Sequence, residues 1–138
     1  MSQVINPPVA VSDPIFGENI TYVESLSQTQ IGITGTWASK LLLTTPSLIT
    51  GVYRVTYTCR VWSAVSNGNI ATEILQDGSI SIITSSKEPK DTDDRLIVTG
   101  YIEIPLTGVH TFDLRFQKTK GGGTVFISDA RLEIFRVS

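Results

Sequence analysis

The sequence of 138 residues contains one cysteine, one histidine and one methionine. A single cysteine excludes an internal disulfide and a metal site built from several thiolates. Basic residues number 11 and acidic residues 13, which gives a formal net charge of −2, and no basic stripe with interleaved aromatic residues occurs. A nucleic-acid-binding surface is therefore not expected.

Long apolar runs are missing as well. No stretch of 18 or more apolar residues occurs, so no membrane-spanning helix and no membrane partner are expected. The first residues, Met-Ser-Gln-Val, lack the basic and apolar regions of a signal peptide. We therefore expect synthesis in a cytoplasm, without signal-peptide export.

Charged side chains are scarce, at 17% of the residues against about 25% in typical globular domains. Hydrophobic residues make up 41%, and serine and threonine fill many of the polar positions. Two explanations remain open: other molecules cover part of the surface, or the surface is a solvated sheet rich in threonine, which favours strands. The length suits one domain that folds without a disulfide or a metal.

The strongest structural signals are two short turn sequences, Asn67-Gly68 and Asp77-Gly78. They separate three strand-like runs at 52–62, 70–76 and 79–84. Asn-Gly and Asp-Gly supply the positive φ angles that tight hairpins need, so these runs predict antiparallel strands joined by hairpins. The chain is therefore expected to be all-β.

The first of these runs alternates clearly between two faces. The face predicted to lie in the core carries Tyr53, Val55, Tyr57, Cys59 and Val61. The opposite face carries Arg54, Arg60 and Trp62 among threonines, and we predict that these three residues bind a partner.

Further strands are predicted at 28–33, 37–45, 95–105, 109–118, 124–128 and 130–137, with residues 41–43 as a buried run. Gly100 is expected where the backbone bends or approaches a neighbour closely. About eight strands without a convincing helix predict an antiparallel β-sandwich, most consistent with a jelly roll, over residues 19–138.

Residues 1–18 differ from the rest because three prolines lie among apolar side chains. Proline removes backbone donors and fixes φ, so this segment is predicted to be an extended N-terminal arm. Its predicted partner-binding residues are Val4, Ile5, Val9, Val11, Ile15 and Phe16. Two interpretations stay open: the arm docks along a sheet edge or on a neighbouring subunit, or it is a frayed terminus.

No pattern in the sequence predicts catalysis. His110 shares a strand face with Phe112 and Phe116, which indicates a packed residue, and no Gly-x-Ser-x-Gly motif is present. Cys59 alternates with apolar neighbours and is expected to be a small buried side chain. No catalytic, cofactor-binding or metal-binding residue is therefore predicted, and no cofactor.

Four weaker possibilities concern exposed side chains. The acidic residues between 87 and 95 favour a solvated charged loop; the alternatives are a partner contact, a calcium site at Asp91, Asp93 and Asp94, or a glycan hydrolase. Trp62 and Tyr101 lie on faces opposite the expected core positions of their strands, which leaves carbohydrate stacking open.

Five short segments carry a resemblance to a known class of proteins: residues 36–41, 51–55, 87–91, 106–112 and 130–137. The chain resembles the small jelly-roll virion proteins of tailed bacteriophages, of the capsid decoration (cement) and fibre-head kinds. The resemblance implies a non-enzymatic structural protein on the surface of a phage particle, often a homotrimer. Its expected partners are the major capsid protein or other virion proteins. The alternative is a receptor- or carbohydrate-binding head domain of a tail fibre or spike.

Overall fold

A computed structural model describes residues 19–66, 68–92 and 94–138. The predicted arm, with Val4, Ile5, Val9, Val11, Ile15 and Phe16, lies outside the described residues, as do Asn67 of the first predicted turn and Asp93. Within these residues the strands are β1 (Asn19–Ser25), β2 (Thr29–Ile31), β3 (Ala38–Thr44), β4 (Leu48–Ser63), β5 (Asn69–Gln76), β6 (Ile80–Lys87), β7 (Leu96–Gly108), β8 (Thr111–Lys120) and β9 (Val125–Arg136). Among the described residues, no helix has the length and apolar character needed to cross a membrane.

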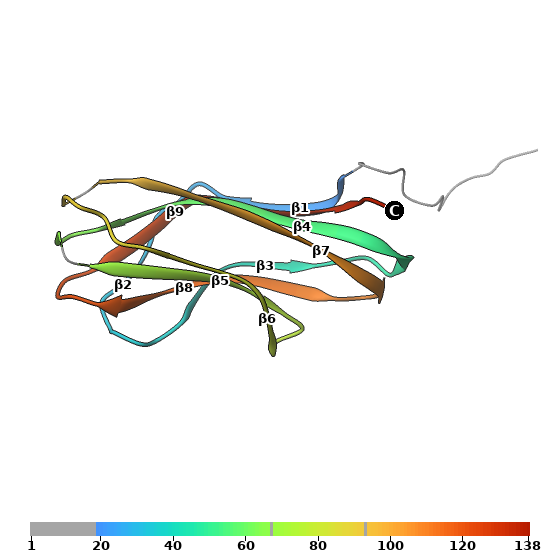
Figure 1. Ribbon diagram of the computed structural model, residues 1–138, viewed down its shortest axis with the longest axis horizontal. Helices are drawn as coiled ribbons and strands as arrows, with labels where there is room; N and C mark the ends of the chain where they lie inside the picture. The colour runs from blue at the N-terminus through green and yellow to red at the C-terminus, as the bar shows by residue number, and fades with distance from the viewer. Residues whose placement is uncertain (1–18, 67, 93) are drawn as a thin grey trace, which may run out of the picture.

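The strands form two antiparallel sheets that face each other in two layers (Figure 1). One sheet has the order β1-β9-β4-β7, with the short β2 also paired to β9. The other has the order β3-β8-β5-β6. Successive strands cross repeatedly between the layers, which is the jelly-roll arrangement. The prediction of an all-β antiparallel sandwich is confirmed.

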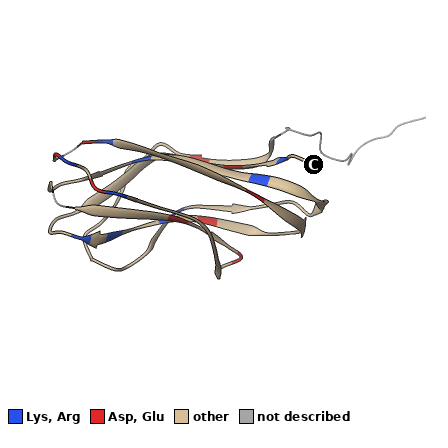
Figure 2. Ribbon diagram, in the orientation of Figure 1, with Lys and Arg blue, Asp and Glu red and all other residues tan. Residues whose placement is uncertain are grey.

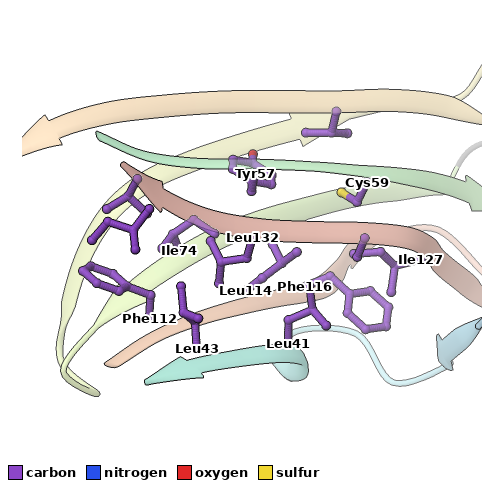
Figure 3. Close-up of a cluster of buried hydrophobic side chains, with 14 of the residues drawn as sticks. Leu41, Leu43, Tyr57, Cys59, Ile74, Phe112, Leu114, Phe116, Ile127 and Leu132 are labelled. Atoms are coloured by element: carbon purple, nitrogen blue, oxygen red, sulfur yellow. The ribbon is translucent and has the colours of Figure 1, made fainter. Parts of the chain in front are cut away.

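The core lies between the two sheets (Figure 3). The five residues predicted for the inner face of β4 are all buried, with exposed fractions of 0–2%. The opposite sheet contributes Leu43, Phe112, Leu114 and Phe116, which are 0–1% exposed and lie in the same core as Leu132 of β9. Apolar side chains of two layers thus interdigitate, as expected for a sandwich core.

Two local predictions of backbone geometry also hold. Asp77 and Gly78 have φ angles of 51° and 76°, as a tight hairpin turn between β5 and β6 requires. The predicted hairpin at Asn67-Gly68 is wrong, because β4 and β5 lie in different sheets and this connection crosses between the layers. A Cβ atom on Gly100 would lie 3.1 Å from Cε1 of Tyr57. Glycine at this position therefore lets β7 pass close to the buried tyrosine ring.

The N-terminal part of the sandwich differs from the prediction of a single strand at 28–33. β1 and β2 both pair with β9, on either side of an irregular connection. β1 is an edge strand with Tyr22 and Glu24 exposed and Val23 only partly buried. Its apolar alternation is weak for that reason, and no turn sequence marks its ends.

Leu42 contradicts the expectation of a buried run at 41–43. Leu41 and Leu43 are buried, but Leu42 is 59% exposed. Residues in a strand alternate between faces, so the middle leucine points to the outer surface of its sheet, opposite Asp113 of β8.

Candidate functional site

The outer surface of the β1-β9-β4-β7 sheet, hereafter the outer face, gathers exposed aromatic and charged side chains. The register places Tyr22, Glu133, Thr56 and Tyr101 in one row across its four strands. Neighbouring strands lie about 4.8 Å apart, so the two tyrosines stand roughly 14 Å apart at opposite edges of the sheet. They are 50% and 62% exposed, respectively.

Arg54 of β4 organises one end of this row. Its Nε donates a 2.9 Å hydrogen bond to Oε2 of Glu103, and Nη2 also bonds that oxygen. Its Cζ lies 4.6 Å from the centre of the Tyr101 ring, a cation–π contact. The tyrosine ring is thereby fixed against a guanidinium whose charge is paired.

Arg131 of β9 has the same role near the other edge. Its two terminal nitrogens each donate a 3.0 Å hydrogen bond, one to Glu24 and one to Glu133. Its Cζ lies 4.0 Å from the centre of the Tyr22 ring. Both edges of the outer face therefore repeat one unit: an arginine, an exposed tyrosine and a paired carboxylate.

A shallow hollow of about 420 Å³ lies on this face. Its lining residues come from β4, β7 and the C-terminal end of the chain: Arg54, Thr56, Tyr101, Glu133, Phe135 and Val137. Its polar groups are largely paired with one another, and its walls are aromatic and aliphatic. Such a surface suits a partner that contributes apolar contacts and a few hydrogen bonds.

The structure separates the three predicted partner-binding residues of β4. Arg54 lines the hollow, with 44% of its side chain exposed. Arg60 is exposed farther along the same face. Trp62 also lies on that side but is only 3% exposed, so the expectation of an exposed tryptophan there is wrong.

Two neighbours cover Trp62. Phe126 stacks on its ring, with ring centres 5.2 Å apart and planes inclined by 14°. The guanidinium of Arg95 lies 4.0 Å from the centre of the same ring. Trp62 therefore offers little surface for stacking on a sugar, whereas Tyr101, the other aromatic residue considered from the sequence, is well exposed.

Sequence reasoning missed Tyr22, Arg131, Glu133 and Phe135. The signal was present for the last three, because they alternate with the apolar Leu132 and Ile134 along β9. Their position beside Arg54 and Tyr101 depends on the pairing of β9 with β4, which no local pattern reveals.

The other candidate groups lie away from the outer face. Burial raises the pKa of the Cys59 thiol to about 12, so it is not an activated nucleophile. Glu88 of the charged loop forms an ion pair with Lys120. In the part of the chain that the structure describes, no three His, Cys, Asp or Glu side chains are arranged to hold a metal ion.

Comparisons with known proteins establish similarity of fold. No protein-family model matches the chain, and no curated protein matches its sequence. A solved structure of infectious bursal virus derived T=1 particles aligns with 97% of this chain at a TM-score of 0.61 and 11% identity. The alignment covers 36% of the viral chain, so this chain spans about a third of its length.

Two further structures share the fold at lower similarity. Infectious bursal disease virus, Gx strain, aligns with 96% of this chain and 42% of its own, with a TM-score of 0.52 and 9% identity. The EclA C-terminal domain, a sugar-binding protein, aligns with 90% of this chain and 82% of its own, with a TM-score of 0.50 and 12% identity. The jelly-roll sandwich is therefore shared with viral capsid and sugar-binding proteins.

Proposed function

We propose that this chain is a non-enzymatic structural protein of a phage particle, a decoration protein that binds the assembled head. The observation that carries the proposal is the row from Tyr22 to Tyr101 across the outer face, with its paired charges. The jelly-roll fold common to this chain and a virus capsid chain supports it. The sequence resemblance to small virion proteins points the same way.

The row between Tyr22 and Tyr101 suits docking because the charges of its two arginines are already paired. Arg54 pairs with Glu103, and Arg131 pairs with Glu24 and Glu133. Covering paired charges costs less free energy than covering isolated ones. Across the described part of the chain, charged residues are sparse and scattered (Figure 2), which leaves few free ions to desolvate.

The apolar contacts on this face set the strength of one docking event. Tyr22, Tyr101 and Ile97 are 50–64% exposed. At about 1.5–3 kcal/mol per fully buried large side chain, covering them contributes roughly 3–5 kcal/mol. A free energy of this size corresponds to about millimolar affinity. Stable attachment then requires several copies that bind together, as on a repetitive shell.

The proposal is tested on particles purified from lysates in which the gene is expressed. Mass spectrometry is expected to find the chain in a fixed ratio to the major capsid protein. The second measurement uses particles that lack the chain, to which purified protein is added. The Tyr22→Ala/Tyr101→Ala double variant is expected to bind them at least about tenfold more weakly than the wild type does. Leu42→Ala, an exposed change on the opposite sheet, serves as the control and is expected to bind normally.

Either of two results would overturn the proposal. The chain could be absent from purified particles, or the double variant could bind as tightly as the wild type. Circular dichroism of each variant separates lost binding from lost folding.

A further inference from the structure

A second hollow, of about 580 Å³, lies on the outer surface of the other sheet. Its lining residues are Trp37, Ala71, Thr72, Thr84, Ser85, Ser86 and Thr119. No charged side chain is among them, and none of them belongs to the outer face described above. Its volume lies within the range of about 300–1,000 Å³ that is usual for small-ligand sites.

Ala71 forms the floor of this hollow. On β5 it pairs with Ser86 of the edge strand β6 and with Gln117 of β8. Its methyl group is shorter than the side chains around it, which leaves open space above the sheet. Thr84 and Ser86 are exposed on one side, and Trp37 precedes β3 on the other.

The ring of Trp37 is held in place by charged neighbours. The Cζ of Arg115 lies 4.7 Å from the ring centre. Arg115 is itself fixed by Glu73, whose Oε2 accepts hydrogen bonds of 3.1 Å from Nε and 3.0 Å from Nη2. Trp37 lines the hollow and Arg115 does not. The tryptophan ring therefore presents to the hollow the surface that Arg115 leaves uncovered.

Three of the lining hydroxyl groups, those of Thr84, Ser86 and Thr119, are exposed and available as acceptors. Ser86 Oγ donates to Oδ1 of Asn69 at 2.9 Å, and Thr119 Oγ1 donates to the Asn69 carbonyl at 3.3 Å. Both oxygens keep free lone pairs because a hydroxyl accepts as well as donates. Thr84 Oγ1 makes no hydrogen bond to the described residues, so it can donate and accept.

From this arrangement we propose that the hollow binds a neutral saccharide. A sugar ring offers an apolar C–H face for the tryptophan and hydroxyl groups that donate to Ser86, Thr84 and Thr119. An anionic ligand would lack a cation among the lining residues. An apolar peptide would leave the Thr84 hydroxyl and the free lone pairs of Ser86 and Thr119 without partners, which costs free energy. The site lies on the opposite sheet from the docking face, and its occupation is independent of particle attachment.

The test is a titration of the full-length protein with a panel of neutral sugars: glucose, galactose, mannose, N-acetylglucosamine and their disaccharides. Amide NMR shifts are expected at residues 37, 71, 84–86 and 119 for at least one sugar. For that sugar, Trp37→Ala is expected to weaken binding about tenfold, because an aromatic contact is lost. Ala71→Leu is expected to abolish binding by filling the hollow.

Two more variants make the outcome specific. Thr84→Val keeps the side-chain shape and strand preference but removes the hydroxyl, and a loss of about threefold to tenfold is expected. Leu42→Ala is expected to bind as the wild type. The proposal is overturned if no sugar of the panel shifts these amides, if the shifts map to the Tyr101 hollow instead, or if folded Ala71→Leu binds normally.

Discussion

Cys59 is 1% exposed, and its side chain faces the core from β4. Burial raises its pKa to about 12, so at pH 8 about one thiol in ten thousand is ionised. Alkylation requires the thiolate and access to it. We expect iodoacetamide to leave the native protein unmodified over hours and to label it within minutes in 6 M guanidinium (about the usual denaturing concentration). Mass spectrometry measures the rate of labelling in each condition. Equal rates would contradict the expectation, because they would show that the core opens readily.

His110 links the β5–β6 turn to the start of β8. Its Nδ1 lies 2.7 Å from Oδ2 of Asp77 and its Nε2 lies 2.9 Å from the carbonyl oxygen of Thr107. Only a doubly protonated imidazole donates to both acceptors. The hydrogen bond to Asp77 raises the pKa of His110, although burial opposes the change. For Asp77, burial raises the pKa, but the hydrogen bonds from His110 and the Thr111 amide outweigh it and lower the pKa.

These shifts define a pH window for stability. A raised histidine pKa stabilises the fold below about pH 6.5 and loses this effect as pH rises through the raised value. A lowered Asp77 pKa stabilises the fold above about pH 3.8 and loses this effect as pH falls through the lowered value. We therefore expect His110→Gln to destabilise most near pH 5–6, by about 1 kcal/mol or less because Asp77 is 38% exposed.

Urea unfolding at a series of pH values measures this difference directly. Asp77→Asn is a matched variant, since asparagine tolerates the positive φ of the turn while the charge is removed. NMR titration of the histidine then gives its pKa in both proteins. A wild-type pKa at or below 6.5 would contradict the pairing.

The position of His110 shows what local pattern cannot supply. The sequence alternation puts it on a face with Phe112, which would bury it in a strand. In the structure it precedes β8, and its side chain turns to a carboxylate 33 positions earlier in the chain. The prediction that His110 is not a catalytic base stays a prediction. Its pairing with Asp77 could not be predicted, because it depends on how the β5–β6 turn packs against the start of β8.

Among the strands, β9 has a break in its alternation: odd-numbered residues face the core in its first part and even-numbered residues in its second part. Val125 and Ile127 are buried in its first part, and Ala130, Leu132 and Ile134 in its second part. Asp129, with a φ of 49°, is the extra residue at the point where the register with β4 shifts. A bulge of this kind moves all following side chains to the other face.

Changes at Asp129 are therefore expected to differ sharply in effect. Inserting one alanine after Asp129, with the bulge kept, shifts the alternation by one residue and points Leu132 and Ile134 outward, so we expect that variant not to fold. Asp129→Gly keeps the bulge and is expected to change stability by less than about 1 kcal/mol. Asp129→Val places a β-branched residue at positive φ and is expected to cost about 1–2 kcal/mol. Thermal unfolding measures all three; a stably folded insertion variant would contradict the role of the bulge.

The same bulge explains which strands could be predicted. β4 alternates without interruption over Tyr53–Val61, so its inner face was identified residue by residue. In β9 the alternation breaks at Asp129, and the sequence indicated two strands where the structure has one. β1 had too few inward apolar residues to be recognised at all.

At the scale of the whole molecule, local alternation and turn sequences were enough to predict an all-β sandwich. They could not predict that Tyr22 and Tyr101 share one row, because this depends on β9 lying between β1 and β4. The two outer surfaces also differ in chemistry. One carries tyrosines with paired charges, and the other carries a tryptophan beside neutral hydroxyls, which fits one surface for docking and one for a small ligand.

If a single copy docks only weakly, stable attachment requires several copies, and we therefore predict that the chain forms an oligomer. We expect the full chain to sediment as a trimer, as the resemblance to virion proteins implies, with residues 1–18 contributing apolar contacts between subunits. The core that the structure describes is formed by residues between Leu41 and Ile134, so a chain lacking residues 1–18 is expected to keep its circular dichroism spectrum. Its trimer is expected to dissociate at concentrations at least about tenfold higher, since several apolar side chains are lost.

Analytical ultracentrifugation compares the two chains, and Leu42→Ala in the full chain controls for loss of one exposed apolar residue. A full chain that stays monomeric at all concentrations would refute the trimer, and equal dissociation of the two chains would refute the role of residues 1–18.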